Sequence, residues 1–516
     1  MAEVSNNDRL VHNTVVLYIR MGISMLIGLY TSRVTIEVLG LDNYGIYGLV
    51  GGLTVVMTIL TSVISASYSR FITFELGRNN QERLKKIFSA AVTIQIVMAM
   101  VGVVLGETIG SWILNMMLDI PQDRMFAANC VWQLTIFSFV IGLIIGPYSA
   151  CIIAHEKMSI YAYYGMLEII LKLGVVYLIY ISPFDKLISY ALLLFLLSGF
   201  MQVLYSKYCA KHFAECHYKF SLSVDKKLFK EMFSFAGWSF VGSTSSIFAN
   251  HVIGLLMNSF FGVAVNAALL IANQVNGALQ GFVGNFMASL SPQITKTYAA
   301  NEMDSFYNLV CRGSKFSYYI YMCLLIPIVI ETKEILNLWL DVVPEYSVVF
   351  IRMIIGVTII NVLAEPVIRG VLATGEIKKY QIYMVCVSWM VFPITWLLFH
   401  LHYGPVYYYY VYFVIFGIIL SFLRLYLFRQ LTKMPIMMYV KNVYFPIIIT
   451  SIIAFIPPLI TYRLVAPGLI SVCSVTAVAL VSSIFSILTV GVSSGERSFI
   501  ISKCVNTFKC KCRIHQ

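Results

Sequence analysis

The stretch 127–153, AANCVWQLTIFSFVIGLIIGPYSACII, contains no Asp, Glu, Lys or Arg. Folded as a helix, it is long enough to cross the hydrocarbon core of a bilayer, which is about 30 Å thick and requires roughly 20 apolar residues. The whole chain has this character, because 59% of its 516 residues are hydrophobic and only 12% are charged, against about 25% charged in a typical soluble domain. Lipid must cover most of this apolar surface, so we predict an all-α integral membrane protein.

The same criterion identifies about fourteen candidate transmembrane helices. They cover 12–35, 46–69, 87–115, 127–153, 159–181, 187–207, 233–259, 264–289, 307–330, 347–371, 380–400, 406–428, 442–462 and 467–491. Each candidate is joined to the next by a short connection, so we expect no soluble catalytic domain. The polar N-terminal residues and the long first apolar stretch lack the pattern of a cleaved secretory signal.

The formal net charge of +12 is distributed unevenly over the connections. Lys and Arg are concentrated in alternate connections, whereas the intervening ones are mostly acidic. The basic set includes Arg70, Arg78, Arg83, Lys85, Lys86, Lys207, Lys211, Lys226, Lys230, Lys296, Arg312, Lys315, Arg369, Lys378, Lys379, Arg424, Arg429 and Lys433. An excess of Lys and Arg marks the cytoplasmic side, so both termini are predicted to be cytoplasmic. Topology accounts for the positive charge, and we predict no nucleic-acid partner.

A gapless shift that places Gly40 on Gly262 also aligns Ile72-Thr73 with Ile294-Thr295 and Asn79 with Asn301. Few identities survive, but the order of elements is the same in both halves. We predict two six-helix lobes related as a parallel repeat, an arrangement found in transporters. The predicted divisions are 1–217 for the first lobe, 218–436 for the second, and 437–516 for two additional helices and a cytoplasmic tail.

The first helix contains an arginine, Arg20, near its middle, and a second, Arg33, near its outer end. A charge at the centre of a spanning helix costs about 2.5–3.5 kcal/mol on insertion scales, so it usually faces other helices or a wet cavity. Ser24 lies one turn from Arg20 on the same face. No acid in the first helix lies within one turn of Arg20. Its partner is therefore a carboxylate from another helix or an anionic substrate, and we favour the substrate.

Further polar residues within the predicted helices are candidates for substrate binding or ion coupling. Asn250, His251, Asn273 and Gln280 are the substrate-binding candidates of the second half. His251 is suited either to a proton cycle or to hydrogen-bonded packing. Glu168 and Lys172 are spaced for an intrahelical ion pair, as are Glu365 and Arg369, so Glu168, Lys172 and Glu365 are either coupling residues or parts of structural pairs. Within the helices basic residues outnumber acidic ones, and we expect a cationic cavity.

No motif for a cofactor, a metal or an enzymatic reaction is found in the sequence. The eleven cysteines lack a disulfide framework, and the tail residues Cys504, Cys510, Cys512 and His515 do not have the spacing of a zinc site. Neither a Gly-Lys-Ser/Thr phosphate loop nor a His-Glu-x-x-His pair is present. We therefore predict a non-enzymatic protein without a cofactor or metal.

The first-helix arginines, the turn Leu39-Gly40-Leu41-Asp42-Asn43-Tyr44-Gly45-Ile46-Tyr47, and the segment from Gly262 through Ala268, Ala272, Gln274 and Ala288 to Ser291-Pro292-Gln293-Ile294 resemble one family. It is the polysaccharide transporter branch, of the O-antigen flippase (Wzx) type, within the multidrug/oligosaccharidyl-lipid/polysaccharide (MOP) exporter superfamily. The resemblance extends over nearly the whole chain.

The resemblance implies a protein of the bacterial inner membrane that moves a polyprenyl-pyrophosphate-linked oligosaccharide, such as an O-antigen or capsule repeat unit, by alternating access. Its implied partners are this lipid-linked substrate, membrane lipids and other proteins of polysaccharide assembly. Arg20 and Arg33 lie where family members carry basic residues. Two alternatives remain: a cation-coupled multidrug antiporter of the same superfamily, which would require acids in the cavity, and a membrane polysaccharide polymerase or glycosyltransferase.

Overall fold

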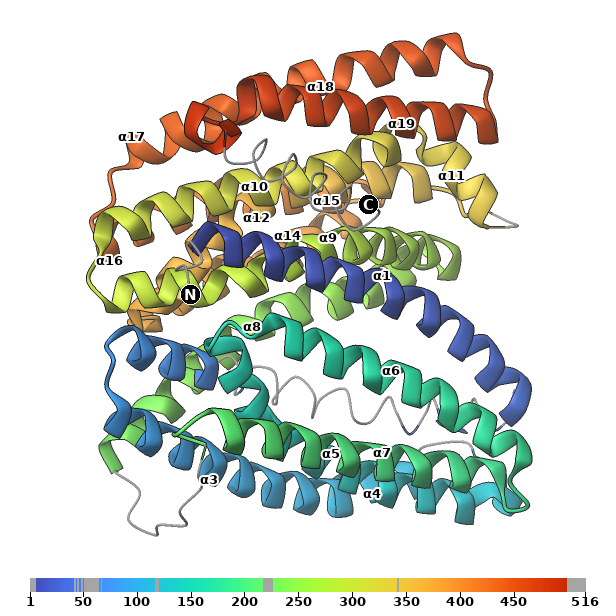
Figure 1. Ribbon diagram of the computed structural model, residues 1–516. Coiled ribbons are helices and arrows are strands. Elements are labelled where there is room, and N and C mark those ends of the chain that lie inside the picture. Colours follow the sequence, from blue (N-terminus) through green and yellow to red (C-terminus); the bar gives the residue numbers. More distant parts are fainter. Residues whose placement is uncertain are drawn as a thin grey trace, which may run out of the picture. The chain divides into compact units, whose positions relative to one another are not determined.

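The computed structural model describes residues 6–40, 43, 46–47, 50, 65, 67–116, 120–216, 226–340 and 343–498. Within these ranges the chain is helical, and no strand occurs in them (Figure 1). The helices of the first half are α1 (Asn6–Leu39), α3 (Gln81–Leu105), the π-helical turn η1 (Gly106–Gly110), α4 (Ser111–Met116), the 3₁₀ turn η2 (Gln122–Arg124), α5 (Met125–Ala154), α6 (Met158–Ile181) and α7 (Lys186–His212).

The second half begins with two long helices, α8 (Lys226–Phe261) and α9 (Val263–Ala299). They are followed by α10 (Met303–Ile330), α11 (Thr332–Trp339), α12 (Ser347–Thr374), α13 (Lys378–Trp389), α14 (Val391–His400), α15 (Tyr407–Tyr412), η3 (Phe413–Ile419), α16 (Leu420–Thr432), α17 (Ile436–Tyr439), η4 (Val440–Tyr444), α18 (Phe445–Leu464), α19 (Leu469–Ser486) and η5 (Ile487–Gly491). The elements η3, η4 and η5 are π-helical.

The all-α membrane fold predicted from composition is confirmed. Ten continuous helices of the described region are long and apolar enough to cross a bilayer, and each coincides with a predicted span. The helices α1, α8 and α9, of 34, 36 and 37 residues, coincide with three more. The remaining predicted span, 46–69, lies mostly outside the described residues. The helix α9 continues ten residues beyond the predicted end of the eighth span, to Ala299.

Contacts between Cα atoms divide the chain into two compact units. Unit 1 comprises Met1–Ser243 and Ala288–Met303, and unit 2 comprises Thr244–Met287 and Asp304–Gln516. The helices α8 and α9 therefore each contribute residues to both units. In unit 1, α5 packs against α3 and α7, and α6 packs against α1 and α7. In unit 2, α12 packs against α16, and α18 pairs with α19 (Figure 1).

The backbone supports the internal repeat found in the sequence. Gly40 and Gly262, which the repeat aligns, have φ angles of 78° and 83°, and the aligned Asn79 and Asn301 have φ angles of 55° and 62°. The N–H groups of Asn79 and Asn301 donate to carbonyls three residues earlier, and the N–H groups of the next residues, Asn80 and Glu302, donate to carbonyls five residues earlier. This is the Schellman pattern, in which a left-handed residue ends a helix. The two copies therefore end equivalent helices in the same way.

Two apolar clusters hold α1 against α6 in unit 1. Leu17 of α1 packs with Met158 and Ala162 of α6 near the beginning of α6. Near the other end, Val38 and Leu39 pack with Val175, Val176 and Ile179. Burial of each such side chain contributes about 1.5–3 kcal/mol in soluble proteins, whereas in lipid close packing replaces much of this term. Arg20 lies between the two clusters, so its position relative to α6 is fixed from both sides.

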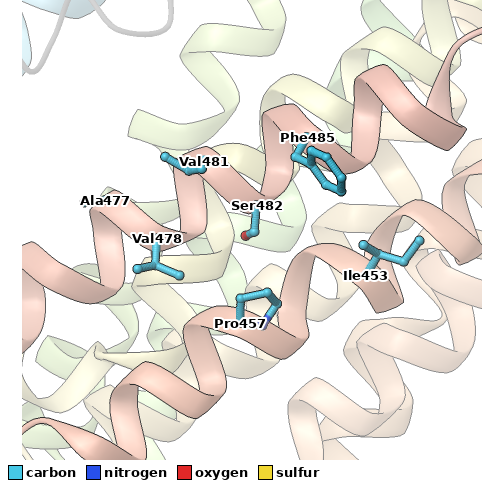
Figure 2. Close-up of a pocket in the computed structure, with 7 residues that line it drawn as sticks. All are labelled: Ile453, Pro457, Ala477, Val478, Val481, Ser482 and Phe485. Atoms are coloured by element: carbon cyan, nitrogen blue, oxygen red, sulfur yellow. The ribbon is translucent and has the colours of Figure 1, made fainter.

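The pair α18–α19 shows how unit 2 accommodates proline in an apolar helix. Pro458 has no N–H, so the carbonyl of Ala454 one turn earlier loses its helical donor. The hydroxyl of Ser482 on α19 donates to this carbonyl at 2.9 Å. Beside this contact, α18 and α19 enclose an apolar groove of about 480 Å³, which Figure 2 shows. Its lining, which includes Ile453, Val478 and Phe485, has no charged side chain that would bind a polar head group.

Candidate functional site

The candidate site is built around Arg20 on α1. Its guanidinium lies over the ring of Tyr161, 4.5 Å from the ring centre. One turn further along α6, Gly165 leaves the space that the guanidinium occupies: a Cβ built on Gly165 would lie 2.5 Å from Arg20 Nε. Tyr161 and Gly165 are four residues apart and therefore share a face of α6. We call Arg20, Tyr161, Gly165, Glu168 and Tyr205 the Arg20 cluster.

The guanidinium of Arg20 has no counter-ion within the described part of the chain. No carboxylate there forms an ion pair with it, and its neighbours are an aromatic ring and a glycine. Ser24, on the same face of α1, has a buried hydroxyl oxygen without a hydrogen-bond partner. Arg20 is therefore a half-buried cation without a carboxylate partner among the described residues, and an unused hydroxyl lies one turn away on the same face of α1.

The third wall of the cluster comes from α7. Tyr205 is 6% exposed, and its ring meets that of Tyr164 edge to face at 5.1 Å. Both Arg20 and Glu168 lie within electrostatic range of Tyr205. Two predicted site residues, Arg20 and Glu168, therefore both lie near Tyr205.

Glu168 and Lys172 form the predicted intrahelical ion pair. Lys172 Nζ donates to Glu168 Oε1 at 2.7 Å, and the side chains of Lys172 and Glu168 are 47% and 38% exposed. Glu168 is therefore neutralised by its own helix, and Arg20 keeps its charge. Glu365 and Arg369 on α12 form the corresponding pair in unit 2, with a longer distance of 3.7 Å. Helical spacing thus yields an ion pair in both cases.

The other predicted site residues are divided between the described and undescribed parts. The side chains of Arg33, Asn250 and His251 lie outside the described residues. On α9, Asn273 is half-buried and Gln280 is exposed, both in unit 2. Their neighbour Asn276 is buried and accepts a hydrogen bond from the hydroxyl of Tyr321 at 3.3 Å.

Arg352, another arginine inside a predicted span, has a structural role. Its Nε donates to the carbonyl of Val329 at 3.1 Å and to the hydroxyl of Thr332 at 3.2 Å, and its Nη2 donates to the carbonyl of Ile330 at 3.4 Å. These carbonyls end α10, where a cation is favoured by the helix dipole. Arg352 is thus a helix cap, and its charge is not directed at a ligand.

Tyr161 and Gly165 are members of the cluster that the sequence pattern did not reveal. The signal available was a tyrosine and a glycine one turn apart on an otherwise apolar helix, but this pattern is common in helix packing. Within the described ranges, no group of three or more His, Cys, Asp or Glu side chains is arranged to hold a metal ion.

Comparisons with known proteins agree with a transporter fold. A family model described as "Polysaccharide biosynthesis protein" matches residues 10–298. No curated protein matches the chain. Among solved structures, the crystal structure of a mutant of a MATE protein is similar with a TM-score of 0.72 at 12% identity, covering 83% of this chain and 96% of the other.

Two further structures cover the same shares of both chains. One is the "Outward-facing conformation of a multidrug resistance MATE family transporter of the MOP superfamily", with a TM-score of 0.68 at 12% identity. The other is a MOP superfamily transporter from Pyrococcus furiosus, described as having a binding pocket of reverse polarity, with a TM-score of 0.68 at 13% identity. At these identities the similarity shows the fold alone.

Proposed function

Because the chain belongs to the polysaccharide biosynthesis protein family, a polysaccharide transporter family of the MOP superfamily, we propose that it is a flippase for a polyprenyl-pyrophosphate-linked oligosaccharide. The substrate would be an O-antigen or capsule repeat unit that crosses the bacterial inner membrane by alternating access. The observation that carries the proposal is the guanidinium of Arg20, which has no described carboxylate partner inside an apolar helical unit.

The pyrophosphate is the part of such a substrate that a membrane excludes most strongly. A guanidinium suits it for two reasons: it does not deprotonate, and its planar fork donates two parallel hydrogen bonds to phosphate oxygens. The ring of Tyr161 and the space above Gly165 hold this fork in one orientation. Ser24, whose hydroxyl has no partner, is a second donor one turn away. The polyprenyl tail would remain in lipid.

The remaining candidates have secondary roles in this proposal. Arg33 would share the pyrophosphate charge, and Asn250, His251, Asn273 and Gln280 would bind sugar hydroxyls. Glu168, Lys172 and Glu365 are the candidates for coupling to an ion.

The test replaces Arg20 with alanine or lysine in cells that make the cognate polysaccharide. We expect both variants to reach wild-type protein levels and to lose surface polysaccharide. Lysine should restore little, because an ammonium cannot donate the bidentate pair. Full surface polysaccharide in Arg20→Ala cells would contradict the proposal. So would purified protein that binds lipophilic cations in competition with protons and does not bind farnesyl pyrophosphate, since that behaviour belongs to the multidrug antiporter.

A further inference from the structure

A second guanidinium without a carboxylate partner among the described residues is buried in unit 2. Arg424 on α16 is 9% exposed and lies eight residues before the end of that helix. Its Nη1 donates to Asn361 Oδ1 on α12 at 2.8 Å. Its Nε is buried and has no hydrogen-bond partner. In the sequence Arg424 belongs to the basic set predicted to be cytoplasmic, but the structure places its side chain inside the helix bundle.

The groups that surround Arg424 do not neutralise it. From α13, the hydroxyl of the buried Tyr380 lies within hydrogen-bonding reach of Arg424, and from α15, Tyr412 lies within electrostatic range. The acid near Tyr380 is Glu365, which lies one turn from Asn361 on α12. The carboxylate of Glu365 forms an ion pair with Arg369. All the described hydrogen-bond partners of Arg424 are therefore neutral.

The charges at this end of the bundle leave a positive excess. Glu365 balances Arg369, so the charge of Arg424 remains. Nearby exposed residues on α13 and α16, namely Lys378, Lys379 and Arg429, outnumber the exposed acid Glu376 at the side that the topology predicts to be cytoplasmic. A buried ion is stable in an apolar bundle only when it is paired and hydrogen-bonded. The basic surface would raise the local concentration of anions at the entrance.

The geometry points to an anion-binding site at Arg424, formed by its guanidinium with Asn361 and Tyr380, which takes one monovalent inorganic anion of halide size. The anion would accept a hydrogen bond from the unused Nε–H of Arg424. A halide suits the site because it brings one negative charge in a small volume and needs no acid among the lining residues. This site does not depend on the proposed transport substrate.

The experiment measures the thermal unfolding midpoint of the purified full chain in uncharged detergent. Sodium chloride is compared with sodium gluconate at equal concentration, so that ionic strength is matched. We expect chloride to raise the wild-type midpoint in a saturable manner, as a ligand of the folded state does. In Arg424→Gln the chloride-specific rise should be absent. No chloride-specific rise in the wild type, or an undiminished rise in Arg424→Gln, would overturn the proposal.

A second variant keeps the test informative if Arg424→Gln does not fold. Arg424 Nη1 donates to Asn361 Oδ1, so Asn361→Asp places a carboxylate at this acceptor position. The carboxylate would then neutralise Arg424 in place of a bound anion. We expect this variant to fold, to have a raised midpoint in gluconate, and to lose the response to chloride. A chloride response equal to that of the wild type would refute the site.

Arg20→Gln is the matched control, because Arg20 also has no carboxylate partner in the described part of the chain. In Arg20→Gln, chloride should still raise the thermal unfolding midpoint, whereas in Asn361→Asp this rise should be absent. If Arg20→Gln alone abolished the response, the anion would bind at Arg20 and the Arg424 proposal would be wrong. Stabilisation by phosphatidylglycerol in detergent, with no effect of chloride, would instead identify a lipid head group and would also overturn the proposal.

Discussion

Replacing Gly165 with alanine should displace the guanidinium of Arg20 without removing its charge. A Cβ at this position would lie 2.5 Å from Nε, 2.7 Å from Cζ and 2.8 Å from Nη2 of Arg20. Non-bonded atoms of this kind settle at about 3.5 Å, so the guanidinium must move by about 1 Å. The obstacle is the end of a flexible side chain, and alanine is a better helix former than glycine by up to about 1 kcal/mol. The fold should therefore be retained.

Displacement of the Arg20 guanidinium should weaken the binding of a pyrophosphate. A hydrogen bond to a charged group contributes about 1.5–3 kcal/mol. If the displacement breaks one of the two parallel hydrogen bonds, binding weakens by about 10- to 150-fold, since about 1.4 kcal/mol corresponds to a factor of ten. Loss of the stacking on Tyr161 would add about 0.5–2 kcal/mol.

The assay is binding of farnesyl pyrophosphate to the purified variant, with the thermal unfolding midpoint measured in parallel. Gly174→Ala is the control, because Gly174 lies on the same helix and has no atom within 4 Å of its ideal Cβ. Gly174→Ala should bind as the wild type does. Wild-type affinity in Gly165→Ala would refute the reasoning, because the position of the guanidinium would then be irrelevant to the anion.

Two further changes test other contacts of unit 1. Gly77→Ala should lower the unfolding midpoint, whereas Gly174→Ala should not, because a Cβ on Gly77 would lie 2.8 Å from the backbone oxygen of Lys296, and such overpacking costs about 1–3 kcal/mol. Burial alone would raise the pKa of Asp185, but two capping backbone N–H groups and Arg124 outweigh burial and lower it. Its contribution to stability is therefore present above its unfolded pKa of about 3.9 and is lost as the pH falls through the lower folded value. Between about pH 5 and pH 3 the wild-type midpoint should fall more steeply than that of Asp185→Asn, which keeps a capping side chain; parallel curves would contradict this assignment.

The helices were predictable where apolar length decides them. The stretch from 127 to 207 divides into α5, α6 and α7 as predicted, because polar residues interrupt it near His155 and Asp185. The end of α9 was not predictable from hydropathy. The polar residues after 289 continue the helix because they pack within unit 1: Lys296 Nζ donates to Glu156 Oε1 at 2.7 Å.

The candidate site was predictable only in part. Arg20 was identified because a charge inside an apolar helix is rare and requires a partner. The Glu168–Lys172 pair followed from helical spacing alone. Tyr161 and Gly165 were not predictable, since their contact with Arg20 depends on how α1 packs on α6. Arg352 and Arg424 both lie within predicted spans, and only the hydrogen-bond acceptors seen in the structure distinguish a helix cap from a buried cation with an unused donor.

One of the contacts that require glycine at residue 77 is made by the residue that the predicted repeat aligns with it. The shift that aligns Gly40 with Gly262 also aligns Gly77 with Ala299, and within unit 1 these equivalent positions are in contact: a Cβ on Gly77 would lie 2.9 Å from the Cβ of Ala299. At such a contact two Cβ atoms cannot both be accommodated, so one copy must carry glycine. The two sequences therefore differ at this position for a steric reason, whereas Asn79 and Asn301 end the two helices in the same left-handed conformation.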